Sequence, residues 1–166
     1  MRQRTAIVRG LALAGIIAAA ACAPVQVHTY MPRSAALTSY HTYAWAPTGA
    51  FETGDPRLDN NTLFIERLQA AVERQLASKG WVPAAAYEAD LMIHFHARVR
   101  TAAGEGRVVY DDGTLFLDFV EPRSNSLVWR GWAEGSVDGV IDNQPWMNEK
   151  IDTAVARILM TFPGKS

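Results

Sequence analysis

The hydrophobic pattern of the chain changes period several times after an apolar N-terminal run, and each change marks a different kind of element. Residues 90–100 alternate, with apolar side chains at the odd positions and mostly polar side chains at the even ones. A period of two is typical of a strand that packs one face on a core. Residues 114–120 and 127–137 are also strand-like, and short turn sequences join the segments, which predicts an antiparallel meander.

Two other segments have a helical period. Between the N-cap candidates at residues 59–61 and the capping glycine Gly80, apolar side chains recur at spacings of three and four. A second amphipathic helix is predicted between Pro145 and Pro163, and a short strand at residues 40–45 precedes the first helix. The element order β-α-β-β-β-α predicts an α+β fold: a mainly antiparallel sheet of about four strands with two helices packed on one face.

The apolar N-terminal run has the layout of a bacterial signal peptide. Several arginines come first, the apolar run follows at residues 10–21, and small residues lead directly to Cys22. A helix that crosses a bilayer needs about 20 apolar residues, so this run is too short to span one. We therefore interpret residues 1–21 as a signal peptide that is removed.

Cys22, the only cysteine of the chain, predicts a lipid anchor. A cysteine directly after the small residues is what distinguishes a lipoprotein signal from an ordinary secretory one, because its thiol becomes the site of acylation. Two or more acyl chains hold a protein stably at a membrane. We expect residues 22–39 to be a lipidated N-terminus and tether, and residues 40–166 to be one domain. Ala23, where an aspartate would signal retention at the inner membrane, favours the outer membrane, facing the periplasm.

The alternative is a plain secretory signal cut near Ala21 or Ala23, which would leave a free thiol in an oxidising compartment.

The charge of the mature chain argues against nucleic acid as a partner. The full sequence has 16 Lys and Arg against 17 Asp and Glu, and removal of the signal peptide takes away three arginines and no acid, which leaves a net charge of −4. Nucleic-acid binding depends on clustered basic side chains that neutralise phosphates. An acidic domain of this kind is a poor candidate for that function.

Several short motifs resemble one family. The most specific is the run from Leu127 to Ala133, Leu-Val-Trp-Arg-Gly-Trp-Ala, which follows Gly-Thr-Leu at residues 113–115. The other matching segments are residues 40–45, 55–59, 76–81 and 89–91, with Asp118. Together they resemble the bacterial lipoproteins grouped as domain of unknown function 4136. The resemblance implies an envelope location and a shared fold, and it implies no activity and no catalytic residue.

The best candidates for metal chemistry are His94 and His96, two residues apart on one face of a predicted strand. Imidazoles that project to the same side can share a transition metal, but a third ligand would be needed from His28, His41 or a carboxylate such as Asp118. The simpler interpretation is a solvated polar face that continues with the arginines at positions 98 and 100.

The acidic residues of the segments 111–112 and 138–142 fit turn and capping roles better than a calcium loop. The sequence contains no nucleophile elbow, phosphate loop or dinucleotide fingerprint. We therefore expect no catalytic residue, no enzyme activity and no cofactor.

The two tryptophans of the run 127–137 must point to opposite faces of their strand. If Trp129 and Gly131 face the core, Arg130 and Trp132 are exposed together. Aromatic and arginine side chains are enriched at protein interfaces, so this pair is the candidate interface. The alternative is that Trp132 packs beneath the tether or a long loop, and the sequence alone leaves open which face is buried.

Two functions remain open at this stage. The preferred one is a non-catalytic envelope lipoprotein, an interaction or accessory module that binds another envelope component, protein or glycan, through its sheet face or an open sheet edge. The alternative is a small-molecule or metal-binding periplasmic lipoprotein.

Overall fold

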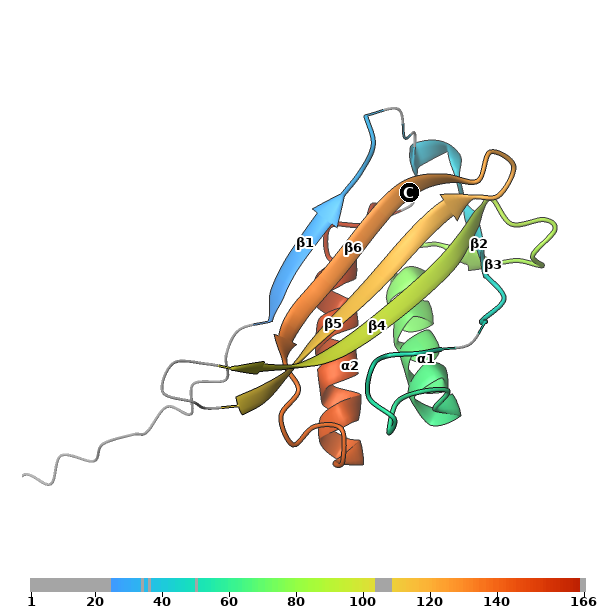
Figure 1. The fold of residues 1–166 in the computed structure, drawn as a ribbon. Helices are drawn as coiled ribbons and strands as arrows, with labels where there is room; N and C mark the ends of the chain where they lie inside the picture. Colours follow the sequence, from blue (N-terminus) through green and yellow to red (C-terminus); the bar gives the residue numbers. More distant parts are fainter. Residues whose placement is uncertain (1–24, 34, 36, 50, 104–108, 165–166) are drawn as a thin grey trace, which may run out of the picture.

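The structure is a computed structural model that describes residues 25–33, 35, 37–49, 51–103 and 109–164 of the chain. It contains one open sheet of six strands with both helices on the same face (Figure 1). The strands are β1 (Gln26–Tyr30), β2 (Thr42–Trp45), β3 (Val82–Pro83), β4 (Leu91–Ala103), β5 (Val109–Glu121) and β6 (Ser126–Ser136). The helices of the described residues are α1 (Thr62–Ser78) and α2 (Gln144–Leu159), and η1 (Leu37–Ser39) is a 3-10 turn.

The predicted α+β class, the two helices and the meander are confirmed, because β4, β5 and β6 pair in antiparallel fashion. The predicted four antiparallel strands and their order are wrong. The sheet is mixed and has the order β1-β6-β5-β4-β2-β3. Strand β2 is parallel to both β4 and β3, since α1 carries the chain back across one face of the sheet before these strands begin.

The other additional strand, β1, lies within residues 22–39, the segment predicted to be a lipidated N-terminus and tether. Its five residues pair with β6 in antiparallel register, from Gln26 opposite Glu134 to Tyr30 opposite Arg130. β1 therefore forms one edge of the sheet, and the two-residue β3 forms the other.

Both helices begin at an asparagine cap. The side chain of Asn61 accepts a hydrogen bond from the backbone N–H of Phe64 at the start of α1, and Asn143 does the same for Trp146 at the start of α2. After α1, Gly80 adopts a φ of 79°, a left-handed conformation that favours glycine. Local capping chemistry thus sets where the helices begin and where α1 ends.

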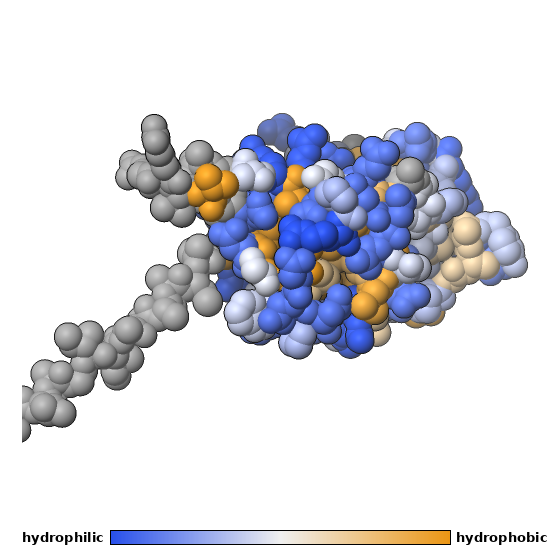
Figure 2. Space-filling model, turned by 60° about the horizontal axis from the view of Figure 1, so that its bottom comes forward, coloured by the Kyte–Doolittle hydropathy of each residue, from blue (hydrophilic) through white to orange (hydrophobic). Residues whose placement is uncertain are grey.

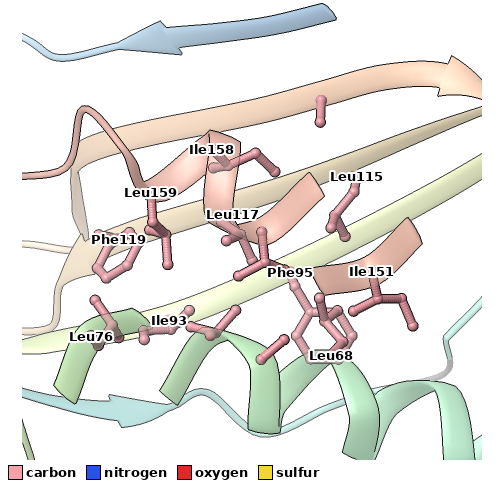
Figure 3. Close-up of a cluster of buried hydrophobic side chains, with 14 of the residues drawn as sticks. Leu68, Leu76, Ile93, Phe95, Leu115, Leu117, Phe119, Ile151, Ile158 and Leu159 are labelled. Atoms are coloured by element: carbon pink, nitrogen blue, oxygen red, sulfur yellow. The ribbon is translucent and has the colours of Figure 1, made fainter. Parts of the chain in front are cut away.

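The core lies between the helices and the inner face of the sheet. Figure 3 shows large apolar side chains of α1 and α2 meeting those of β4 and β5. Trp129 of β6 is 3% exposed and packs edge-on against Phe119 and Phe162, with ring centroids 5.4 Å and 5.0 Å away. The fully or nearly fully buried side chains include Leu68, Val72, Leu76, Leu91, Ile93, Leu117, Phe119, Val155, Ile158, Leu159 and Phe162.

Within the described residues, no helix combines the length and the apolar character that crossing a lipid bilayer requires.

Candidate functional site

The face of the sheet opposite the helices carries the candidate site, and we call it the outer face. Because alternate residues of a strand point to opposite sides, the buried position of Trp129 directs Arg130 and Trp132 outward. The strand register then aligns the outer-face residues in rows. One row is His28, Trp132, Phe116 and His96, and its neighbour is Tyr30, Arg130, Asp118 and His94.

The first row is a series of stacked rings. The centroids of His28 and Trp132 lie 5.1 Å apart at an interplanar angle of 24°, and those of Trp132 and Phe116 lie 6.1 Å apart at 25°. The indole Nε1 of Trp132 donates a hydrogen bond of 3.0 Å to Oε1 of Glu134. The rings therefore turn their flat faces toward one another, and we call this series the aromatic row.

The environment of Trp132 lies between the two alternatives that the sequence left open, exposure on the sheet face and packing beneath the tether or a loop. It points to the outer face, as the exposed alternative requires, yet it is half-buried, because β1 brings His28 against it. The segment interpreted as a tether thus supplies one of its neighbours.

The second row contains a fixed ion pair. Nε of Arg130 donates to Oδ1 of Asp118 at 2.6 Å, and Nη2 donates to the other carboxylate oxygen. The Asp118 side chain is only 8% exposed, whereas that of Arg130 is 41% exposed. The hydrogen bond to Asp118 raises the pKa of Arg130, although burial opposes the shift. The guanidinium carbon also lies 5.8 Å from the ring centroid of Phe116, so Arg130 is held in one position on the outer face.

The two candidate metal ligands, His94 and His96, point to the outer face as expected, the first half-buried and the second exposed. Within the described residues, no three His, Cys, Asp or Glu side chains are grouped so that they could hold a metal ion. Across the sheet, the register places Asp118 beside His94, but the hydrogen bonds of Asp118 are to Arg130. The histidine pair therefore finds no third ligand in the described part of the chain.

A shallow hollow of about 490 Å³ lies on the outer face beside β4. Its lining includes His96, Arg98, Arg100, Phe116, Arg130 and Glu134. Sequence reasoning placed the two β4 arginines on this face but did not connect them with Phe116 or Arg130. Only the strand register reveals that they share one surface.

A second, apolar cavity of about 90 Å³ lies between the sheet and the helices. It exists because the inner face changes from large side chains to small ones there, among them Ala97, Gly113, Ala133 and Gly135. Sites for small organic ligands usually enclose about 300–1,000 Å³, so this cavity is far below that range. It gives little support to the small-molecule alternative.

The acidic residues assigned to turns have structural partners. Asp142 pairs with Arg57, which also holds Asp55 through a hydrogen bond of 2.9 Å from Nε to Oδ1. This hydrogen bond from Arg57 lowers the pKa of Asp55. Asp138 accepts a hydrogen bond of 2.8 Å from the backbone N–H of Asp111. These contacts join the loop before α1 to the loop between β6 and α2, and that loop to β5. The turn interpretation holds for Asp138 and Asp142 but is wrong for residues 111–112, which lie within β5 because the strand continues through them to pair with β4 and β6.

The surface in Figure 2 is mostly hydrophilic, with small hydrophobic areas between polar groups. An interface on a face of this kind depends on specific polar and aromatic groups more than on a broad apolar patch. The predicted lipidation site, Cys22, lies outside the described residues.

These features define a two-layer α+β domain with one sheet face that neither α1 nor α2 covers. The chain belongs to the family described as a domain of unknown function, DUF4136, whose model matches residues 27–164. The resemblance drawn from the sequence motifs is thereby confirmed. No curated protein matches the chain.

Several solved structures share the fold. A DUF4136 family protein from Bacteroides thetaiotaomicron has a TM-score of 0.55 and 15% identity over 80% of this chain and 95% of that one. A PelC dodecamer from Paraburkholderia phytofirmans has a TM-score of 0.52 and 11% identity over 86% of this chain and 100% of that one. A PDZ domain protein from Parabacteroides distasonis has a TM-score of 0.57 and 12% identity, and the match covers 86% of this chain but only 37% of that protein. At these identities the likeness concerns the fold alone.

Proposed function

We propose that the protein is a non-catalytic envelope lipoprotein, anchored to the outer membrane through acylated Cys22, that binds an envelope partner with its outer face. The observation that carries the binding role is the pairing of the aromatic row with the fixed guanidinium of Arg130. Both present specific groups on a sheet face that neither α1 nor α2 covers. Trp and Arg are the residues that most often dominate the binding energy of interfaces.

A protein partner fits this surface better than a glycan. Sugars commonly bind with a ring laid flat on an aromatic face, and the aromatic row offers few free faces, because its rings are stacked on one another. Ring edges and the free N–H groups of Arg130 remain available instead, and protein side chains and backbone carbonyls are suited to both.

The anchor is tested at Cys22. Mass spectrometry of the mature N-terminus should find a chain that begins at an acylated Cys22, and Cys22→Ser should move the protein from the membrane fraction to the soluble one. An uncleaved chain or a free thiol would refute the anchor.

The interface is tested by site-specific crosslinking in intact cells. A photoreactive amino acid at position 132 should capture one recurrent envelope protein, and Arg130→Ala in the same chain should reduce that capture. The same photoreactive residue at Glu66, an exposed position on α1, is the matched control and should not capture it. A different set of proteins in each experiment, or equal capture from both positions, would argue against the outer face as the interface.

A further inference from the structure

The outer face of β4 carries a basic stripe, which we define as His94, His96, Arg98 and Arg100. These are four successive outward positions of one strand, and none of them is acidic. The mature chain as a whole has an excess of acidic residues, so this stripe runs against the overall charge. Along the strand, neighbouring members of the stripe are about 6.6 Å apart, because each step covers two residues.

The two arginines of the stripe are available for a ligand. Both are exposed, and neither forms an ion pair or a side-chain hydrogen bond within the described part of the chain. Asp112 stands opposite Arg100 in the register but makes no ion pair with it. Arg130, in contrast, is already engaged by Asp118. Arg98 and Arg100 are therefore the arginines of the outer face whose guanidinium groups stay unpaired within the described residues, with the carboxylates of Glu52, Asp112 and Glu134 nearby on the same face or hollow.

The stripe lies along two hollows that meet at His96. The hollow of about 490 Å³ is lined from His96 to Arg100, and a smaller one of about 130 Å³ is lined by His94, His96 and the segment 46–49. Both linings include Glu52, His96 and Ala97, so the two hollows adjoin one another along β4, and we call them together the groove. An extended chain fits this shape better than a compact ligand does.

The groove also has acidic flanks. Glu52 lies at one side of the larger hollow, and Glu134 lies at the other, where it accepts a hydrogen bond from Trp132. A uniformly negative surface or polymer would meet these carboxylates along with the arginines. A peptide can place carboxylates on the stripe and donate its own N–H groups to the flanks.

We propose that the basic stripe of β4 binds an acidic peptide segment in extended conformation, with carboxylates at every second residue facing Arg98 and Arg100. In an extended peptide, side chains on one face repeat with the same spacing as the stripe, so one carboxylate meets each arginine. The inference rests on the proposed function, since it names the chemistry of a partner for the outer face.

The test measures the binding of short fluorescent peptides to the full mature protein by fluorescence anisotropy. One peptide alternates threonine and glutamate, and a second has the same composition with its glutamates consecutive. The alternating peptide should bind more tightly and should weaken as salt is raised. The double variant Arg98→Gln/Arg100→Gln should lower its affinity about tenfold, from two ion pairs at an exposed surface.

The matched control removes the same charge elsewhere. Arg67 on α1 and Arg123 in the β5–β6 turn are both exposed, and Arg67→Gln/Arg123→Gln should leave the affinity within about twofold of the wild type. Circular dichroism of both double variants verifies that each is folded.

Three outcomes would overturn the proposal. They are unchanged affinity in the stripe variant, equal binding of the two peptides, and binding of anionic phosphatidylglycerol vesicles or an acidic polysaccharide as tight as that of the alternating peptide. If crosslinking at position 132 succeeds while the peptide experiment fails, the outer face is still an interface and only the assigned partner chemistry is wrong. If the crosslinking and the peptide experiments both fail while Cys22 is acylated, the lipid anchor is supported, and the outer-face interface and the peptide site on the basic stripe are both refuted.

Discussion

At Gly131 the inner face of β6 has no room for a side chain. A Cβ there would lie 2.6 Å from Cγ2 of Ile158 and would also collide with the indole of Trp129. We predict that Gly131→Ala lowers the free energy of unfolding by about 1–3 kcal/mol, the usual cost of overpacking a core. Urea denaturation measures this change in the free energy of unfolding. Gly49→Ala is the control, because a Cβ at that position would have no heavy atom within 4 Å other than those of its chain neighbours, and equal stability of the two variants would contradict the prediction.

The ion pair on the outer face differs from a surface pair elsewhere in the same protein. Asp118→Asn removes the charge that fixes Arg130, and we predict a loss of about 1–2 kcal/mol in the free energy of unfolding. Arg74 and Asp152 make a similar contact, but their side chains are 60% and 58% exposed. Asp152→Asn should therefore change stability by less than about 0.5 kcal/mol. If both substitutions have the same effect, the burial of Asp118 has no energetic consequence.

At the scale of elements, Asp90 joins two strands. Its Oδ2 accepts hydrogen bonds from the backbone N–H groups of His41 and Thr42, at 2.7 Å and 2.9 Å, and from the Thr42 hydroxyl at 3.0 Å. The backbone N–H of Asp90 donates to the same hydroxyl at 2.9 Å. This reciprocal contact ties the start of β2 to the start of β4.

We predict that Asp90→Ala loosens β2 without unfolding the helices. Amide hydrogen exchange at His41 and Thr42 should accelerate, because both N–H groups lose their acceptor. Exchange in the middle of α2 should change little. Glu88→Ala, a substitution at a nearby exposed residue, is the control, and the same pattern of exchange in both variants would argue against a specific role for Asp90.

The elements also show what the sequence determines and what it leaves open. The period of two located the meander, and the stripes and caps located both helices, because these signals are local. The direction of β2 depends on how α1 crosses the sheet, and β1 is a short edge strand whose partners lie far away in the sequence. Neither follows from local periodicity.

The candidate site, too, follows in part from local sequence patterns and in part from long-range strand pairing. Alternation alone predicted that Arg130 and Trp132 share a face. The ion pair with Asp118 and the stacking of Trp132 on Phe116 depend on the register of β5 with β6, which no local pattern specifies.

At the scale of the whole molecule, stability should depend on acidic pH. The hydrogen bond from Arg57 lowers the pKa of Asp55. Burial alone would raise the pKa of Asp90, but the hydrogen bonds from His41 and Thr42 outweigh it and lower that pKa as well. A carboxylate with a lowered folded-state pKa stabilises the protein above its unfolded-state pKa, and this contribution is lost as pH falls through the folded-state value.

We therefore predict that the free energy of unfolding is nearly constant from about pH 7 to pH 5 and falls below about pH 4, where unfolded aspartates begin to take up protons. Urea denaturation at several pH values measures the slope. Asp55→Asn and Asp90→Asn should each be less stable at neutral pH and should each reduce the slope below pH 4. Asp152→Asn is the control, and a slope that neither substitution alters would place the pH dependence in other groups.

The pairing of β1 with β6 also has a consequence for the order of folding. The two strands are separated by about a hundred residues, and β6 is synthesised long after β1. Until β6 has formed, β1 has no strand to pair with, whereas β4, β5 and β6 are neighbours in sequence and close only short loops. We expect the meander to assemble first and β1 to add last, so the assembled sheet exposes an unpaired edge of β6 until the N-terminal segment docks on it.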